Sequence, residues 1–455
     1  MSQILTSLLA FVVAIGLLVA IHEYGHYIVA RVLGVKVLRY SIGFGRVIWS
    51  RRAGTDQTEY CLSAIPLGGY VKLLDERDCA VTFAERGRAF NRQSAAARIA
   101  ILAAGPAFNL IFAILAYTIM FIGGVPGMKP VIGPVDSGSL AAAAGLREGD
   151  RIIAVGDRRV FTWETATVAI LDEMLADGAI RLAVVGRTGG ERPVTLQTAG
   201  RESELTEPGQ LFAKLGLKPW SPEPEPVLGE ISPGGAAERA GLQPGDRILL
   251  ADGKVVKTWT GWVKIVRARP GELLDITVRR GDADVELTIE VASEQTADGR
   301  IGRIGAAVSL PKDLLDGMRA EERYGPLEAL GRATAKTWEM STLTLRMIWR
   351  MLVGDVSPRN ISGPINIAQY AGVTASLGAT AFLSFLAIVS ISLGVLNLLP
   401  IPMLDGGQIV YTVAESLKGG PLSERAQVIG QQIGIGFLLV LMSFAFYNDI
   451  SRLLG

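Results

Sequence analysis

The chain has 455 residues, a formal net charge of +1 and a mean hydropathy of +0.34, and 20% of its residues are charged. A positive mean hydropathy argues against an ordinary soluble protein and indicates lipid-embedded segments joined to a water-soluble part. The balanced charge argues against a nucleic-acid partner, because no basic face dominates. The two cysteines, Cys61 and Cys79, precede the second apolar segment, so the long middle region has no disulfide framework.

Four apolar segments are long enough to cross a lipid bilayer as helices. They lie at about 4–30, 99–125, 377–400 and 429–447. A cleaved signal peptide is the alternative for the first segment, but no basic residue precedes it. A further stretch, 337–354, is apolar on one face and carries three charged residues, so we predict a helix that lies in the membrane interface.

Basic residues beside the apolar segments predict the orientation of the chain. From Arg31 to Arg98 there are twelve Lys and Arg residues and six acidic residues, and nothing basic precedes the first apolar segment. The positive-inside rule therefore places this loop in the cytoplasm. Both termini and the middle block, 126–376, are then expected on the opposite side, and four spans satisfy this arrangement.

The middle block contains an internal repeat. Residues 129–164 and 225–260 align without a gap at an offset of 96, and both copies contain Ala-Gly-Leu followed by Gly-Asp-Arg. A short helix, a Gly-Asp turn and a strand are typical of a small α+β domain, so we predict two such domains at 126–205 and 222–310. The stretch 206–227 is rich in Pro and Glu and is expected to be the linker.

The motif His-Glu-Tyr-Gly-His at residues 22–26 lies inside the first apolar segment. Glu23 is the only charged residue from Met1 to Ala30, and the two histidines are the only ones in the chain. A charge at the centre of a membrane helix costs about 2.5–3.5 kcal/mol on insertion scales. We therefore expect that this cost is offset at Glu23, as a bound cation would offset it. On a helix His22 and His26 share one face and can hold one zinc ion, with Glu23 beside them as general base.

A catalytic zinc site needs a third protein ligand, and no further histidine exists. Pro400 and Pro402 are expected to break the helix after Asn397, because each removes a backbone donor. Asp405 then lies where a helix restarts, followed by two glycines that allow close backbone approach. We predict that Asp405 is the third ligand; the alternative is an ordinary helix N-cap at the cytoplasmic interface.

Taken together, these motifs resemble the site-2 protease family of intramembrane zinc metalloproteases. The resemblance rests on HEYGH, on AGPAFN at 104–109, on NLLPIPMLDGG at 397–407, and on the repeated domains, which resemble bacterial PDZ domains. It covers essentially the whole chain. It implies a polytopic α-helical membrane protein with four transmembrane helices, a membrane-associated β-sheet and two inserted α+β PDZ domains.

The resemblance also implies how the chain is divided. The membrane core would consist of 1–125 and 377–455, with a cytoplasmic β-rich loop at 36–97 that forms the sheet. Interfacial amphipathic helices would occupy 311–376. A plain cytoplasmic hairpin is the alternative for the β-rich loop, and a purely structural role is the alternative for either PDZ domain.

Individual residues acquire roles from the same resemblance. His22, His26 and Asp405 would bind one Zn²⁺ per chain, and Glu23 would be the general base. The residues expected to contact substrate are Asn397, Pro400, Pro402, Gly43 and Gly45, and the PDZ ligand loops would include Ile132, Gly133, Leu228 and Gly229. Ser392 departs from the family pattern, because close relatives often have a second Asn there, which leaves one auxiliary contact to substrate in doubt.

The implied activity is cleavage of single-pass membrane proteins of the anti-sigma factor type, or of signal-peptide remnants, in the bacterial inner membrane. The PDZ domains would lie in the periplasm. His26 and His22 would lie roughly 8 and 14 Å from Arg31 along the helix, near the cytoplasmic side.

Two alternatives differ in class from a zinc protease. A metal transporter would need further polar residues along the other spans, and an inactive PDZ scaffold would not need Glu23. A Ser-His-Asp protease is excluded, because no histidine remains outside the motif.

Overall fold

The computed structural model describes residues 2–78, 80–187, 189–207, 209–296, 299–310 and 316–454, so Cys79 lies outside the described residues. By length and composition, four of the helices in this part could cross a membrane. They are α1 (Ser2–Val32), α2 (Ala95–Gly123), α11 (Ala379–Asn397) and α13 (Glu424–Leu454). Each overlaps one of the four predicted apolar segments, which confirms the prediction of a polytopic helical membrane protein.

Helix α2 lies at the centre of the helical part, where it contacts α1, α11, α9 (Pro326–Leu352) and α12 (Asp405–Lys418). Ser94 caps its start by accepting a hydrogen bond from the Ala97 N–H. Small residues let α1 and α2 approach closely, because a Cβ on Gly25 would lie 2.4 Å from the Ala104 oxygen. This close approach fixes the face of α1 that carries the two histidines.

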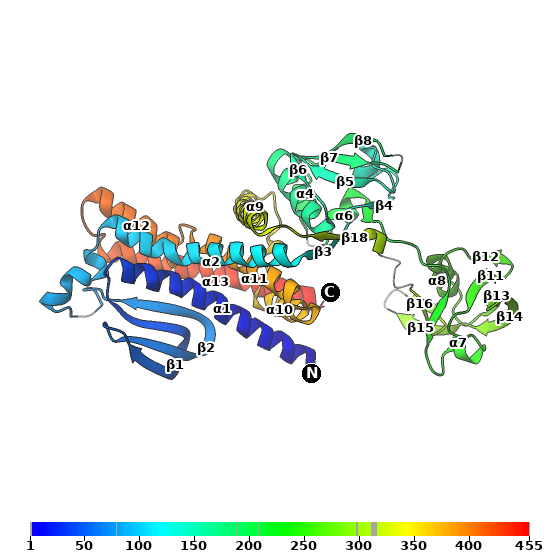
Figure 1. Cartoon of the computed structure of the whole chain (residues 1–455), viewed down its shortest axis with the longest axis horizontal. Helices are drawn as coiled ribbons and strands as arrows, with labels where there is room; N and C mark the ends of the chain where they lie inside the picture. Colours follow the sequence, from blue (N-terminus) through cyan, green and yellow to red (C-terminus); the bar gives the residue numbers. More distant parts are fainter. Residues whose placement is uncertain are drawn as a thin grey trace.

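A sheet of two long strands, β1 (Val37–Ala53) and β2 (Thr58–Leu73), packs against α1 (Figure 1). The strands bend, so that residues 37–42 pair with both 59–62 and 69–73. Gly43 and Gly45 form the bend in β1, with φ of +91° and +82°. Residues 69–73 pair on one side only within the described chain, so they form a free edge.

The middle block forms two modules with matching elements. In the first module these are β4 (Ile132–Val135), α3 (Leu140–Ala143), β5 (Arg151–Val155), β6 (Arg158–Arg159), α4 (Trp163–Asp177), β7 (Ala179–Val185) and β8 (Glu191–Gln197). In the second they are β10 (Leu228–Ile231), α7 (Ala236–Arg239), β11 (Arg247–Ala251), β12 (Lys254–Val255), α8 (Trp259–Arg267), β13 (Leu273–Arg280) and β14 (Ala283–Glu290). From β4 to the start of α4, each element begins 96 residues before its counterpart, as the repeat predicts.

The first module extends further than we predicted. Helix α6 (Leu211–Leu215) and strand β9 (Leu217–Pro219) follow residue 205, and β9 pairs with β4. Leu211, Leu215 and Leu217 are buried in the core of this module. The stretch expected to be a linker from residue 206 therefore belongs to the first module as far as Pro219, because its spaced leucines complete the core. The second module is completed in the same way by β17 (Ala306–Val308), which pairs with β10.

After the second module the chain returns to the helical part. Strand β18 (Arg319–Glu322) pairs with β3 (Val125–Met128), which follows α2, and α9 and α10 (Pro364–Leu377) come next. The expected run of interfacial helices at 311–376 thus includes a strand. Shorter elements are η1 (Phe83–Arg88), η2 (Phe90–Arg92), α5 (Glu202–Leu205), β15 (Ala292–Thr296), β16 (Gly299–Arg303), η3 (Asp316–Met318) and η4 (Pro358–Asn360).

Candidate metal centre

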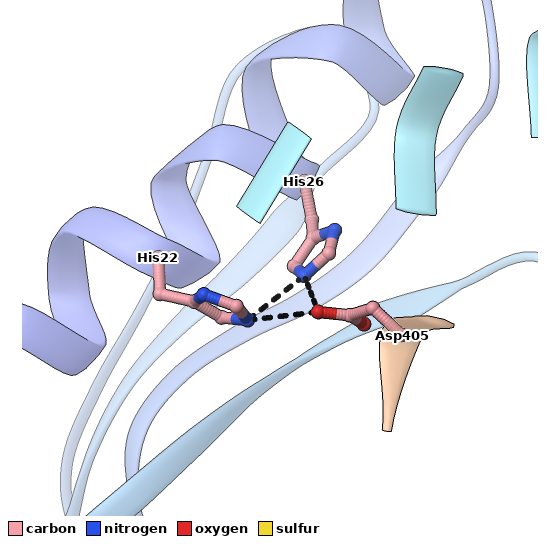
Figure 2. Close-up of side chains that lie close together, drawn as sticks. All are labelled: His22, His26 and Asp405. Carbon is pink, nitrogen blue, oxygen red and sulfur yellow. Dashed lines mark hydrogen bonds and ion pairs between the residues drawn. The ribbon is translucent and has the colours of Figure 1, made fainter. Parts of the chain in front are cut away.

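Two side chains of α1 meet a third from a distant part of the sequence, Asp405, at one face of that helix (Figure 2). His22 and His26 are one helical turn apart, and their Nε2 atoms are 3.2 Å from each other. The Asp405 Oδ2 atom lies 3.1 Å from Nε2 of His22 and 3.5 Å from Nε2 of His26. All three ligand atoms lie within 4.8 Å of one another, which is close enough for a single metal ion.

Helix α2 orients His26. The His26 Nδ1 atom lies 2.8 Å from the Ile101 carbonyl oxygen, so the Nδ1 proton is donated there and Nε2 keeps its lone pair. Gly105 of α2 makes room for the ring, because a Cβ at this position would lie 2.3 Å from His26 Nε2. The expected tautomer and the position of this ligand atom therefore follow from how α1 packs on α2.

Asp405 is placed by a break between two helices. Helix α11 ends at Asn397 and α12 begins at Asp405, as the two prolines predict. Gly406 and Gly407 let α12 pack on the preceding turn, because a Cβ on either would lie within 2.3 Å of a carbonyl oxygen in residues 398–401. Leu404 occupies the N-cap position and makes no side-chain cap, so the Asp405 side chain is not an ordinary N-cap.

The donor set fits a zinc ion. The Asp405 Oδ2 atom is buried and has no hydrogen-bond partner among the described residues, although both Nε2 atoms are within ion-pair distance. A buried carboxylate oxygen without a hydrogen bond is costly unless a cation or donor meets it. Two imidazole nitrogens and one carboxylate oxygen are the three protein ligands of a common type of catalytic zinc site.

Glu23 and the metal ligands line one cavity of about 700 Å³. The Glu23 side chain is 9% exposed and interacts with the backbone of Val71 on the free sheet edge. A Cβ on Gly69 would lie 3.0 Å from the Glu23 Cγ, so this edge passes close to the carboxylate. The cavity thus joins a candidate metal site, a candidate base and an exposed strand edge.

The residues predicted to contact substrate are only partly brought together. Asn397 lines the cavity, whereas Pro400 and Pro402 shape the turn before Asp405 and are not among the lining residues. Gly43 and Gly45 lie at the bend of β1, and Phe44 between them lines the cavity instead. Ser392 is half-buried and donates a hydrogen bond to the Ile388 carbonyl of its own helix, 3.1 Å away.

Sequence reasoning missed two features of this site. The first is Asn109 of α2, which lies 3.2 Å from His22 Nδ1; a polar residue inside an apolar segment was the available signal. The second is the edge formed by Gly69, Tyr70 and Val71, which line the cavity. Nothing in the sequence marks the end of β2 as a free edge, because this edge depends on how β1 and β2 bend.

The residues predicted for the PDZ ligand loops lie at the start of β4 and of β10. Ile132 and Leu228 are fully buried, and Gly133 and Gly229 lie against the backbone of the strands that pair with β4 and β10. In the second module a groove of about 480 Å³ lies between β17 and α8, with Trp262, Val266 and Ala306 among its lining residues. The ligand-binding roles of Ile132, Gly133, Leu228 and Gly229 stay predictions.

Comparison with known proteins gives a clear family assignment. The sequence profile of Peptidase family M50 matches residues 10–441. The chain belongs to this family. It is therefore a member of the site-2 proteases that the motifs resemble, and a protease of the metalloprotease class.

Full-length relatives support the assignment. The regulator of sigma-E protease RseP of Escherichia coli K12 is 41% identical over 459 residues, which covers 100% of both chains. A protein of Vibrio cholerae serotype O1 named "Putative zinc metalloprotease" is 41% identical over 456 residues, again with 100% of both chains covered. The regulator of sigma E protease of Haemophilus influenzae is 38% identical over 449 residues and covers 99% of each chain.

Two solved structures are similar to part of this chain. A PDZ domain of an SdrC-like protein from Listeria monocytogenes is 19% identical, with a TM-score of 0.17, and covers 20% of this chain and 92% of that one. An HtrA-type protease, AlgW, is 19% identical with a TM-score of 0.15, covering 38% of this chain and 68% of the other. These scores carry no argument about the arrangement of the whole chain.

Proposed function

We propose that the protein is a zinc-dependent endopeptidase that cleaves transmembrane segments of single-pass membrane proteins. The observation that supports this most directly is the convergence of His22, His26 and Asp405 beside Glu23 inside one cavity. Zn²⁺ held by these residues would supply a Lewis acid for the substrate carbonyl and make water a stronger acid. The family membership supports the same chemistry.

Glu23 has the position of a general acid and base. Its carboxylate takes a proton from the attacking water and later gives it to the amine that leaves. Because the side chain is largely buried and faces both histidines and Asp405, it is held at the reacting centre. A scaffold without activity would have no use for this carboxylate, so the proposal favours the protease over that alternative.

The free edge of β2 is the proposed binding site for the substrate backbone. A helix keeps its amides in internal hydrogen bonds, so a peptide bond must be held in an extended segment before it is cleaved. Residues 69–73 form a strand edge beside Glu23 that pairs with no other strand in the described part of the chain, and an extended peptide can add to such an edge. Asn397, which also lines the cavity, would contact the substrate as well.

The substrate class is proposed from the relatives. RseP of Escherichia coli is named as a regulator of sigma-E, so we infer a membrane-bound anti-sigma factor as the type of substrate, with signal-peptide remnants as a further type. The protein would lie in a bacterial inner membrane. The loop from Arg31 to Arg98 would face the cytoplasm, the two modules would face the periplasm, and the sheet of β1 and β2 would dip into the membrane.

A peptide-binding role is proposed for the second module. Its groove lies between a strand edge, β17, and a helix, α8, which is the arrangement that PDZ domains use to add an extended peptide to a sheet. The lining includes Trp262 and Val266, which suits an apolar chain end. We infer that this module is a PDZ domain that binds the end of a peptide exposed on the periplasmic side.

The test of the proposed function compares wild type with Glu23→Gln after reconstitution in lipid vesicles. The substrate is a single-pass protein without a folded outer domain, and zinc bound per chain is measured in parallel. We expect one zinc in both proteins and a loss of cleavage of about 100-fold or more in the variant, the usual contribution of a general base. The matched control is Glu286→Gln, an exposed residue of β14, which should cleave as wild type does.

Three results would contradict the proposal. Equal cleavage by wild type and Glu23→Gln would assign the activity to another centre. If the wild-type protein retains no zinc, the proposed zinc site is wrong. Zinc transport into vesicles without cleavage of any of several single-pass substrates would favour the transporter.

A further inference from the structure

Asn109 is fully buried in α2 and faces the first metal ligand. Its side-chain Nδ2 lies 3.2 Å from Nδ1 of His22, and its side chain is 0% exposed. The Oδ1 atom of the same amide is buried and has no hydrogen-bond partner among the described residues. Nothing on that side therefore holds the amide in the orientation with Nδ2 toward the histidine.

The two orientations of this amide have opposite consequences for His22. An amide N–H donated to Nδ1 requires a lone pair on Nδ1, so the imidazole proton would be on Nε2. That proton would point at Asp405, and Nε2 could not bind a metal (Figure 2). Rotating the amide by half a turn places Oδ1 at Nδ1, where it accepts the proton and leaves the Nε2 lone pair free. The nitrogen and oxygen atoms of an amide are nearly equal in size, so the hydrogen-bond partners decide which of the two faces Nδ1 of His22.

The backbone of Asn109 is held in place by a neighbouring helix. The hydroxyl of Ser390 in α11 donates a hydrogen bond to the Asn109 carbonyl oxygen, 2.8 Å away, and both residues are fully buried. A Cβ on Gly394 would lie 3.4 Å from the Asn109 Cβ, so α11 packs directly against this residue. The amide thus has a fixed base from which to reach His22.

We infer that Asn109 is a positioning residue for the metal centre, in which Oδ1 accepts the Nδ1 proton of His22 and keeps Nε2 as a ligand atom. This inference rests on the proposed metal site. It gives both histidines the same arrangement, because α2 also accepts the Nδ1 proton of His26 at the Ile101 carbonyl. Partners of this kind fix the ring orientation and tautomer of metal-binding histidines.

The inference differs from a packing role in a measurable way. Leucine has the same number and branching of side-chain heavy atoms as asparagine and suits an apolar helix, so Asn109→Leu keeps the outline of the side chain and removes the acceptor. Aspartate keeps an oxygen at the same place in either charge state, so Asn109→Asp preserves the acceptor and removes the N–H donor. The matched control is Thr118→Val on the same helix, because its hydroxyl bonds only to the Ile114 carbonyl of α2, 2.7 Å away, in the structure described.

The experiment measures zinc affinity of the full-length chain in detergent by competition with a chelator, and the visible spectrum after cobalt replaces zinc. We expect Asn109→Leu to bind zinc about 10–100-fold more weakly than wild type, the usual effect of losing such a partner. Asn109→Asp and Thr118→Val should bind within about threefold of wild type. The cobalt spectrum of Asn109→Leu should change, because the orientation of one ligand is lost.

Three other outcomes would contradict either the role of Asn109 or the proposed metal site. If wild type binds zinc and Asn109→Leu binds it equally well, Asn109 has only a packing role. If Asn109→Asp binds more weakly than Asn109→Leu, the amide donates through Nδ2 and the inference is wrong. If wild type itself binds no zinc, the proposed function fails before Asn109 is tested. A thermal unfolding curve identifies a variant that does not fold. If Asn109→Leu does not fold, the zinc affinity of Asn109→Asp decides, because the proposed role of Asn109 requires this variant to bind zinc as wild type does.

Discussion

At the scale of single residues, the candidate metal centre depends on a missing side chain as well as on its proposed ligands. Gly105 of α2 faces the His26 ring, and the nearest atom to a Cβ added there is the proposed ligand atom Nε2. The tip of a side chain can move away from a new methyl group at little cost in stability. Here that movement displaces the ligand, so a substitution should affect the site far more than the fold.

We therefore predict that Gly105→Ala retains the wild-type unfolding temperature within a few degrees but loses about 100-fold in cleavage rate, the order expected when a reacting group shifts by 1 Å. Zinc affinity measured by chelator competition should fall as well. The control is Gly16→Ala in α1, where no atom lies within 4 Å of the added Cβ. Full activity in Gly105→Ala would show that His26 is not held by this contact.

Some residues of the site could be predicted from the sequence and others could not. His22, Glu23 and His26 share one short motif in a segment where charge is costly, and Asp405 follows a helix break set by two prolines. These signals are local. The partnership of Asn109 with His22 joins residues 87 positions apart and depends on the rotation of α2 against α1, which no local pattern contains.

At the scale of elements, each module is closed by a buried aspartate in its Gly-Asp turn. In the second module Asp246 accepts two hydrogen bonds from Arg280, at 2.8 and 2.7 Å, and one from the Gln243 N–H at 2.8 Å. Burial alone raises the pKa of Asp246, but these hydrogen bonds outweigh it and hold the pKa below its ordinary value. The ionised carboxylate therefore stabilises the folded module.

We predict that Asp246→Asn destabilises the second module by about 1–3 kcal/mol at pH 7, because Arg280 loses a charged partner. The stabilisation by Asp246 is fully present above the unfolded pKa of about 3.9 and is lost as the pH falls through the lower folded pKa. The difference between variant and wild type should therefore shrink below about pH 4. Calorimetry of the full-length chain checks this, with exposed Asp282→Asn as the control. A difference that grows in acid would contradict it.

The boundaries of the two modules were harder to predict from the sequence than the repeat itself. Identical residues in both copies predicted the short helix, the Gly-Asp turn and the strand that follows it in each module, because these residues form the same turns and core positions. The closing strands β9 and β17 share little sequence, and β9 lies within a stretch that composition marks as a linker. Their pairing with β4 and β10 is non-local, so it follows from the fold and not from the pattern.

At the scale of the whole molecule, the two modules differ in how they are joined to the helices. The core of the first module includes Leu343 and Val356, which belong to α9 and the loop after it. The carbonyl and carboxylate of Asp172 in α4 accept hydrogen bonds from Arg346, and Arg350 donates to the Leu175 carbonyl at 2.8 Å. Among the described residues, the core of the second module contains only residues of that module. The first module thus shares its hydrophobic core with α9, whereas the second module has a core of its own.

We predict that Leu343→Ala exposes this difference. Removal of a buried leucine costs about 2–5 kcal/mol, and the cost here falls on the first module and α9 together. Hydrogen exchange of the full-length protein should show faster exchange in β5, β7 and α9, with no change in β11 and β13. Leu345→Ala is the matched control, because Leu345 is 47% exposed two residues further along the same helix, whereas Leu343 is 8% exposed. Equal loss of protection in both modules would mean that they unfold as one unit, and substrate bound in the groove of the second module could then act on the membrane helices directly. Loss confined to the first module would leave α9, which packs on α2, as the route by which that module influences α2 and the candidate metal ligands.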